Sequence, residues 1–229
     1  MSAVATAIDA ARAEGRGALI GYLPIGYPDL QTSIEAAVTL AEAGVDILEL
    51  GPPYSDPVMD GPVIQEATNA ALQAGFRMRD TFTAVREVSA RTDVPVLVMT
   101  YWNPVVQYGV SRYADDLSAA GGAGLITPDI TPDAASDWLA ESTRTGLARV
   151  FLAAPSSTDA RLEMIVRETT GFVYTVSTMG ITGERAQLDA AARALVARLR
   201  EHGAERACVG IGVSNADHVR SVLEYADGA

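Results

Sequence analysis

Short apolar runs that alternate with alanine-rich segments constrain the fold of this chain more than any other feature of its sequence. The runs are rich in leucine and β-branched residues, which is typical of strands buried on both faces of a parallel sheet. Seven of them lie at residues 17–23, 45–51, 94–102, 123–129, 148–154, 172–177 and 206–212. In the segments between them, such as 33–44, apolar side chains recur at helical spacing, and Gly44 ends that predicted helix. The pattern predicts an α/β protein.

The 229 residues are predicted to form a single domain, residues 1–229, because no linker, low-complexity tract or shift in composition interrupts the alternation. Two architectures fit it, a closed (β/α)8 barrel and an open doubly wound sheet. An open sheet that binds a dinucleotide carries G-x-G-x-x-G after its first strand, whereas residues 21–30 read GYLPIGYPDL. We therefore predict a (β/α)8 TIM barrel. A barrel needs eight strands and the sequence shows seven, so we expect this chain to lack the last strand and helix.

The charge balance limits the classes of partner. The chain has 17 Lys and Arg against 29 Asp and Glu, a net charge of −12, which repels nucleic acid and anionic lipid. No apolar run reaches the roughly 20 residues that span a bilayer. The single cysteine, Cys208, cannot form an internal disulfide, and the first residues lack the pattern of a signal peptide. We expect a cytoplasmic protein that binds neither nucleic acid nor membranes.

Acidic side chains follow the second predicted strand, in the segment ELGPPYSDPVMDGPVIQEA at residues 49–67. Glu49 lies on an otherwise apolar strand, where loss of solvation raises the pKa of a carboxyl group and suits it to proton transfer near neutral pH. We interpret Glu49 as functional, because burying it has a cost without structural return; the alternative is a helix cap or an ion pair with arginine. For Asp56 and Asp60, beside proline and glycine, a turn-forming role is the more common one.

Glycine-rich turns follow the sixth and seventh predicted strands, with Gly180 and Gly183 in the first and Gly210 and Gly212 in the second, and a helix is predicted to start after the second turn, at Ser214 or Asn215. Barrels often bind phosphate with loop amides and a helix N-terminus near their last strands, so a small phosphorylated substrate is one hypothesis. The alternative is that these glycines only form tight turns.

Metal chemistry is not expected from the histidines. His202 and His218 lie on predicted helices away from strand ends, and solvated helix positions explain both. The sequence has no CxxC, no Walker loop and no HExxH. These features indicate acid-base chemistry without a metal.

Five segments carry a resemblance to a known family: ELGPPYSDPVMDGPVIQEA, TYWNPVVQYG, PDITPD, GFVYTVSTMGITG and VGIGVSNADHV. Together, and collinearly from about Ile20 to Gly228, they resemble the tryptophan synthase alpha subunit family. The resemblance implies a (β/α)8 barrel and a lyase that cleaves indole-3-glycerol phosphate to indole and glyceraldehyde 3-phosphate by a retro-aldol reaction, without a cofactor, in tryptophan biosynthesis.

The resemblance also implies roles for individual residues. Glu49 would transfer protons to and from the substrate, and Asp60 would bind the indole N–H and stabilise the cationic intermediate. The residues that would line the indole pocket are Tyr22, Met99, Tyr101, Ile126, Leu152, Tyr174 and Ile211. Gly183, Gly210 and Gly212 match phosphate-binding turns. Thr182 matches a residue of a mobile loop in the family, and its hydroxyl would contact Asp60. The chain departs from the family at Tyr54, usually Phe, and at Met59, usually a small residue, so we expect the loop to pack or close differently.

A partner is implied in the same way. Family members work with a tryptophan synthase beta subunit, a pyridoxal phosphate enzyme, in an alpha2-beta2 complex, with residues 55–59 and 107–113 on the docking side. Three functions stay open: an alpha-type lyase acting in such a complex, a stand-alone indole-glycerol-phosphate lyase, and a non-catalytic subunit that activates a beta-type partner.

Overall fold

The predicted alternation of strands and helices is present in the computed structural model, which describes residues 1–176, 185–210 and 213–229. The strands are β1 (Ile20–Pro24), β2 (Ile47–Gly51), β3 (Val96–Met99), β4 (Gly124–Thr127), β5 (Ala148–Ala153), β6 (Val173–Val176) and β7 (Ala207–Gly210). The helices are α1 (Ala3–Ala13), α2 (Leu30–Glu42), α3 (Pro62–Gln73), α4 (Met78–Ser89), α5 (Trp102–Tyr108), α6 (Val110–Ala119), α7 (Ser136–Thr145), α8 (Asp159–Glu168), α9 (Arg185–Glu201) and α10 (Ala216–Leu223), with a 3-10 turn η1 (Pro132–Ala134). Within these ranges, no helix is long and apolar enough to cross a membrane.

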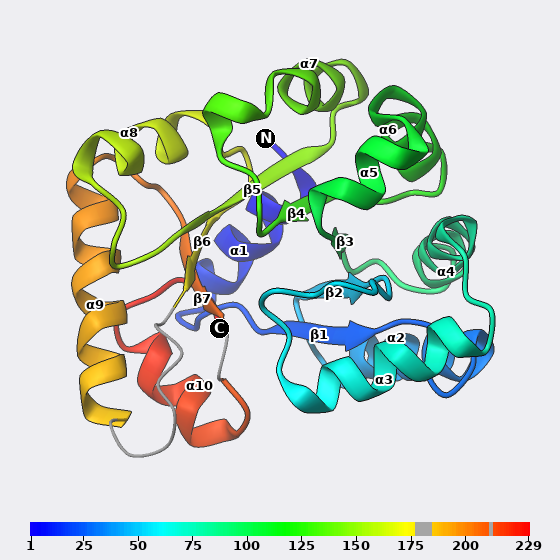
Figure 1. Cartoon of the computed structure of the whole chain (residues 1–229). Coiled ribbons are helices and arrows are strands. Elements are labelled where there is room, and N and C mark those ends of the chain that lie inside the picture. Colours follow the sequence, from blue (N-terminus) through cyan, green and yellow to red (C-terminus); the bar gives the residue numbers. More distant parts are fainter. Residues whose placement is uncertain (177–184, 211–212) are drawn as a thin grey trace.

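The strands form one parallel sheet in chain order, from β1 to β7, and each neighbour is reached through a helical connection. Figure 1 shows the connecting helices outside the sheet, which is the arrangement of a (β/α) barrel. Each of the seven apolar runs overlaps one of the strands, and only β1 extends past its run, by one residue, so the predicted barrel with seven counted strands is confirmed.

Alternation along the strands separates two apolar layers. On β2, Leu48 and Leu50 face the helices, whereas Ile47 belongs to an inner cluster with Leu97, Ile126, Val150 and other residues from the middle of the sheet. Because side chains of a strand alternate between its faces, Glu49 points to the same inner side as Ile47.

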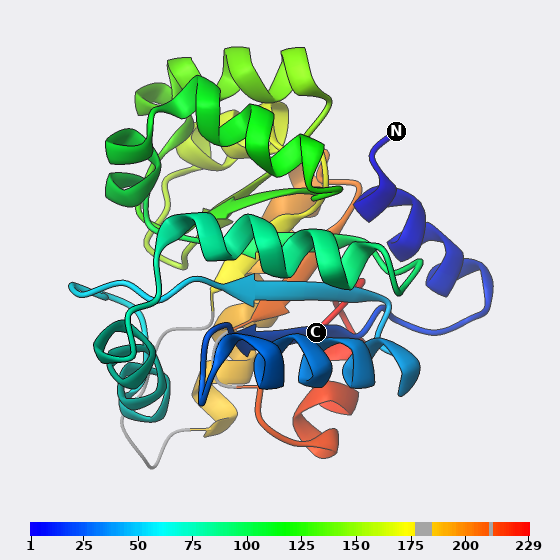
Figure 2. The same cartoon turned by 90° about the vertical axis from the view of Figure 1, so that its right-hand side faces the viewer.

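The N-terminal helix α1 covers one end of this inner cluster. Val4, Ile8 and Ala11 of α1 are fully buried and pack against the inner cluster. Figure 2 shows α1 at the end of the sheet where the strands start. The carboxyl ends of the strands, where barrels hold their reactive groups, are therefore left to the connecting loops.

Residues 227–229 join the two edges of the sheet. Gly228 forms parallel bridges with Ala18, just before β1, and with Cys208 of β7. The amide of Val209 donates to the Gly228 carbonyl at 3.0 Å, and the amide of Ile20 donates to the carbonyl of Ala229 at 2.8 Å. These three residues occupy the place of an eighth strand at its first positions, which the count of apolar runs did not foresee.

Candidate active site

Glu49 opens onto a cavity of about 400 Å³ at the inner side of the sheet. The lining residues come from β1, β2, β6, β7 and the start of α10, and they include Tyr22, Tyr174 and Gly210 among the predicted site residues. The cavity thus lies between the two edges of the sheet, next to Ala229. Its walls are largely aromatic and aliphatic, as a site for a flat apolar ring requires.

The carboxyl group of Glu49 is held without a counter-ion. The residue is 3% exposed and lies in register between Tyr22 of β1 and Leu97 of β3. Burial raises its pKa to about 8, and no guanidinium of the described residues forms an ion pair with it. The alternative interpretation, a structural ion pair with arginine, therefore finds no support in the described part of the chain. A carboxyl group in this state is mostly protonated at neutral pH and can both give and take a proton.

Asp60 lies at the end of the loop between β2 and α3 and is half-buried. Its Oδ1 accepts a hydrogen bond from the Tyr101 hydroxyl at 3.2 Å, and its carbonyl accepts one from Gln65 Nε2 at 2.7 Å. Burial raises the pKa of Asp60, and the bond from Tyr101 opposes that shift. Asp60 is thus fixed at both its side chain and its backbone.

The acids that flank this pair have structural partners. Asp56 is exposed and accepts a 2.6 Å hydrogen bond from its neighbour Ser55, in agreement with a turn-forming role. Asp129, after β4, accepts the amide of Trp102 at 2.8 and 3.1 Å. It therefore caps the first residue of α5 from another loop, because the N-cap position Tyr101 supplies no such bond.

The other predicted pocket residues fall into three groups. Met99, Ile126, Leu152 and Tyr174 belong to the inner cluster, on neighbouring strands. Tyr22 is 37% exposed at the cavity, and Tyr101 is 6% exposed beside Asp60. Thr182, Gly183, Ile211 and Gly212 lie outside the described residues.

Two glycines at this end of the sheet make room for tyrosine rings. A Cβ atom on Gly210 would lie 2.0 Å from the Tyr174 hydroxyl, and one on Gly51 would lie 2.4 Å from the Tyr22 hydroxyl. Neither tyrosine could keep its position beside a larger residue. Gly210 thus has a packing role in addition to the expected phosphate contact.

The start of α10 supplies cavity residues that were not among the predicted site residues. Ser214 and Asn215 line the cavity, and Asn215 caps the helix by accepting the amide of His218 at 3.0 Å. His218 lies in the first turn, and its Nδ1 accepts the amide of Ser214 at 3.3 Å, so this partly exposed side chain also takes part in the cap. The N-cap pattern, which placed the helix start at Ser214 or Asn215, was the signal for this contact.

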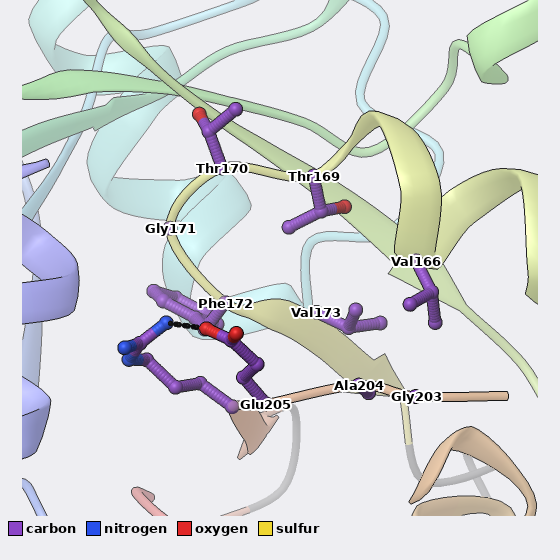
Figure 3. Close-up of a pocket in the computed structure, with 10 residues that line it drawn as sticks. Val166, Thr169, Thr170, Gly171, Phe172, Val173, Gly203, Ala204 and Glu205 are labelled. Atoms are coloured by element: carbon purple, nitrogen blue, oxygen red, sulfur yellow. Dashed lines mark hydrogen bonds and ion pairs between the residues drawn. The ribbon is translucent and has the colours of Figure 1, made fainter. Parts of the chain in front are cut away.

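A second cavity, of about 280 Å³, lies at the opposite end, between the turns that precede β6 and β7. Figure 3 shows Thr169, Thr170 and Gly171 along one side and Gly203 to Glu205 along the other. The Glu205 carboxylate is paired there with the guanidinium of Arg206, which also binds Asp9. None of the predicted site residues lines this cavity.

Comparison with known proteins assigns the family. Residues 8–229 match the family model described as tryptophan synthase alpha chain. The chain is 67% identical over all its 229 residues to the tryptophan synthase alpha chain of Leifsonia xyli subsp. xyli, of which it covers 88%. It is 55% identical over 96% of its length to that of Mycobacterium avium, of which it covers 81%.

Solved structures agree with the sequence comparison. A Mycobacterium tuberculosis tryptophan synthase structure superposes with a TM-score of 0.93 at 51% identity, over 99% of this chain and 87% of that one. A tryptophan synthase complex from Pyrococcus furiosus gives 0.83 at 35% identity, over 93% and 86%. Because the family model matches residues 8–229 and a relative is 67% identical over the whole chain, the chain belongs to the tryptophan synthase alpha chain family.

Proposed function

We propose that this chain cleaves indole-3-glycerol phosphate to indole and glyceraldehyde 3-phosphate, the lyase reaction of its family in tryptophan biosynthesis. The observation that carries the proposal is the uncompensated burial of Glu49 at a cavity with apolar walls, which brings the pKa of its carboxyl group to about 8. A catalytic acid with a pKa near the working pH transfers protons efficiently in both directions. The cytoplasmic location expected from the sequence is part of this proposal.

Glu49 has two steps in this reaction. The protonated carboxyl group first gives its proton to C3 of the indole ring, which leaves a positive charge at the ring nitrogen. The resulting carboxylate then takes the proton from the side-chain hydroxyl next to the ring. As that proton leaves, the hydroxyl oxygen forms the aldehyde C=O bond, and the electrons of the broken C–C bond return to the ring. One residue thus gives and regains one proton.

Asp60 stabilises the charge that the first step creates. Its carboxylate, with one oxygen bound by Tyr101, would accept the indole N–H through the other. A fixed negative charge at the edge of a partly desolvated site stabilises the cationic intermediate more than solvent would. The indole ring would contact Met99, Ile126, Leu152 and Tyr174, and Tyr22 of β1 would cover one side of the ring pocket. Gly210 with the predicted Thr182, Gly183, Ile211 and Gly212 would complete the ring and phosphate contacts.

A beta-type tryptophan synthase subunit is the proposed partner, in an alpha2-beta2 complex. Val58, on the loop after β2, is 75% exposed, Val63 of α3 is 76% exposed and Val106 of α5 is 48% exposed. These three are among the few large apolar side chains exposed in the described residues. Val58 and Val63 lie close to Asp60 in sequence, and Val106 lies on the helix whose N-cap residue, Tyr101, binds Asp60. Apolar side chains gathered near a site favour a docking surface there.

The test measures indole release from indole-3-glycerol phosphate by the purified chain, alone and with a beta subunit. Stimulation by the beta subunit supports the alpha-type lyase, and high activity alone supports a stand-alone lyase. No release under either condition contradicts the proposed function, and a rise in beta turnover would then identify an activating subunit.

Variants of single acids separate catalysis from folding. Glu49→Gln should lower cleavage at least 10²-fold, as expected for loss of a general acid, and Asp60→Asn should also lower it strongly. Asp56→Asn is the matched control, because it removes an exposed acid of the same loop. In the chain alone, an equal loss in all three variants would point to a disturbed loop and contradict the assigned roles.

A further inference from the structure

The hydroxyl of Tyr101 is shared between two groups of the loop between β2 and α3. It accepts the amide of Met59 at 3.0 Å and donates to Oδ1 of Asp60 at 3.2 Å. A phenol has a single proton to donate, and an amide can only donate, so the Met59 bond leaves that proton for Asp60. Tyr101 is 6% exposed, which allows its ring little freedom. The direction of the Asp60 carboxylate therefore depends on where the Tyr101 ring lies.

The ring of Tyr101 is supported by Tyr54, from the same loop as Asp60. The two ring centroids are 5.2 Å apart, with an interplanar angle of 35°. The hydroxyl of Tyr54 accepts a hydrogen bond from Asn103 Nδ2 at 3.1 Å. Asn103 belongs to α5, whose first amide is capped by Asp129. A phenylalanine at position 54 would keep the ring contact but lose this attachment to the helix.

We propose that Tyr54 is a positioning residue for Asp60, which acts by fixing the Tyr101 ring against α5. The inference rests on the proposed function, since it deepens the role of Asp60 in cleavage. A catalytic carboxylate contributes most when its geometry is set before substrate binds, and one loose contact behind it lowers that contribution. The Tyr54 hydroxyl provides a contact of this kind outside the residues that touch the ring of the substrate.

The environment of Asp60 makes its titration a usable readout. Within the described residues, the titratable group that acts on the pKa of Asp60 is the phenol of Tyr101, which donates to it. Tyr22 on β1 is also near, because its own pKa is raised by burial first and then by Asp60 and Glu49. No described arginine forms an ion pair with it, so the Tyr101 bond is the interaction that favours its charged form. A looser Tyr101 must therefore raise the pKa of Asp60.

The experiment measures the pKa of Asp60 by ¹³C NMR titration of its side-chain carboxyl carbon in the substrate-free chain. The pH profile of indole release is measured for the same variants. Tyr101→Phe should raise the pKa of Asp60 by about one unit, as expected for loss of a hydrogen bond to a carboxylate. Tyr54→Phe should raise it by about half of that, and Asn103→Ala should match Tyr54→Phe. Because Tyr54 acts through Tyr101, the double variant should shift no further than Tyr101→Phe alone.

Activity gives the second readout. Tyr54→Phe should lower kcat about three- to tenfold with a KM within about twofold, and move the acidic limb of the profile upward. Both activity measurements use the chain alone, without a beta subunit, and Tyr108→Phe is the matched control, since it removes another tyrosine hydroxyl bond of α5, the one to Asp116.

Four results for the pKa of Asp60 would overturn the proposal. They are an unchanged pKa in Tyr54→Phe, an unchanged pKa in Tyr101→Phe, additive pKa shifts in the double variant, and a pKa shift in Tyr108→Phe equal to that in Tyr54→Phe. A wild-type chain that releases no indole would contradict the proposed function, while the NMR titration would still decide this inference.

Discussion

Replacing Glu49 by glutamine should make the folded protein more stable while it removes cleavage. Glu49 is 3% exposed, has no ion pair within the described chain, and has its pKa raised from 4.5 to about 8 by burial. Between these pH values the folded protein holds a proton that the unfolded chain has released. The stability of the wild-type protein must therefore fall as the pH rises through this range. Glutamine has a similar shape and no charge, so it escapes this penalty.

The size of the effect follows from the pKa difference. Each pH unit above 4.5 costs the wild-type protein about 1.4 kcal/mol relative to the variant, until the folded pKa is reached. The accumulated difference is about 1 kcal/mol at pH 5.5 and about 3 kcal/mol at pH 7. It levels off above pH 8, where Glu49 is ionised in both states. Any hydrogen bond that glutamine gains or loses is independent of pH and shifts all values equally.

The assay is urea denaturation of both proteins, followed by circular dichroism at pH values from 5.5 to 9. Other titrating groups are common to both chains, so the difference in the free energy of unfolding isolates Glu49. Glu35→Gln is the matched control, because Arg91 lowers the pKa of exposed Glu35 to about 2 and its effect should be flat over this range. A difference between wild type and Glu49→Gln that is constant with pH would refute the assigned burial and charge state.

Three further predictions concern activity and closure of the sheet. Since Glu49 must be protonated to start the reaction, kcat/KM should fall at alkaline pH with a midpoint near pH 8. A midpoint above pH 9 would contradict this prediction. Gly210→Ala places a Cβ atom 2.0 Å from the Tyr174 hydroxyl, so the melting temperature should fall and cleavage should fall at least about tenfold. Adding Tyr174→Ala removes the clash, so the double variant should lose less thermal stability than the sum of the two single variants. Additive losses of stability would argue against a clash. Asp227 accepts hydrogen bonds from two arginines and from the amide of Ala207, so Asp227→Asn should cost about 2–4 kcal/mol in urea denaturation, and a change below about 0.5 kcal/mol would mean that this acid does not hold residues 227–229.

Much of the candidate site could be predicted from local pattern. An acid on a buried strand must share the face of the residue two positions away, and Glu49 does so with Ile47. The helix start predicted at Ser214 or Asn215 agrees with the N-cap Asn215 of α10, and the structure places it at the cavity. The hydroxyl of Tyr54 could be recognised as a departure from the family, but its partner Asn103, 49 residues away, could not. A side-chain hydrogen bond depends on a few tenths of an ångström in the packing of a loop against a helix, and spacing in sequence contains no such information.

The amino-acid pattern alone was enough to predict which segments become strands and helices and that the strands are parallel, because apolar runs and helical spacing are set by neighbours along the chain. The packed barrel was needed to show that Glu49 faces inward, that Gly228 bridges Ala18 and Cys208, and that the Tyr101 hydroxyl, 41 residues along the chain, binds Asp60. Bringing segments that are far apart in sequence into contact costs chain entropy, and the curvature of the whole sheet decides which of them meet. Such contacts therefore form only when the entire barrel packs.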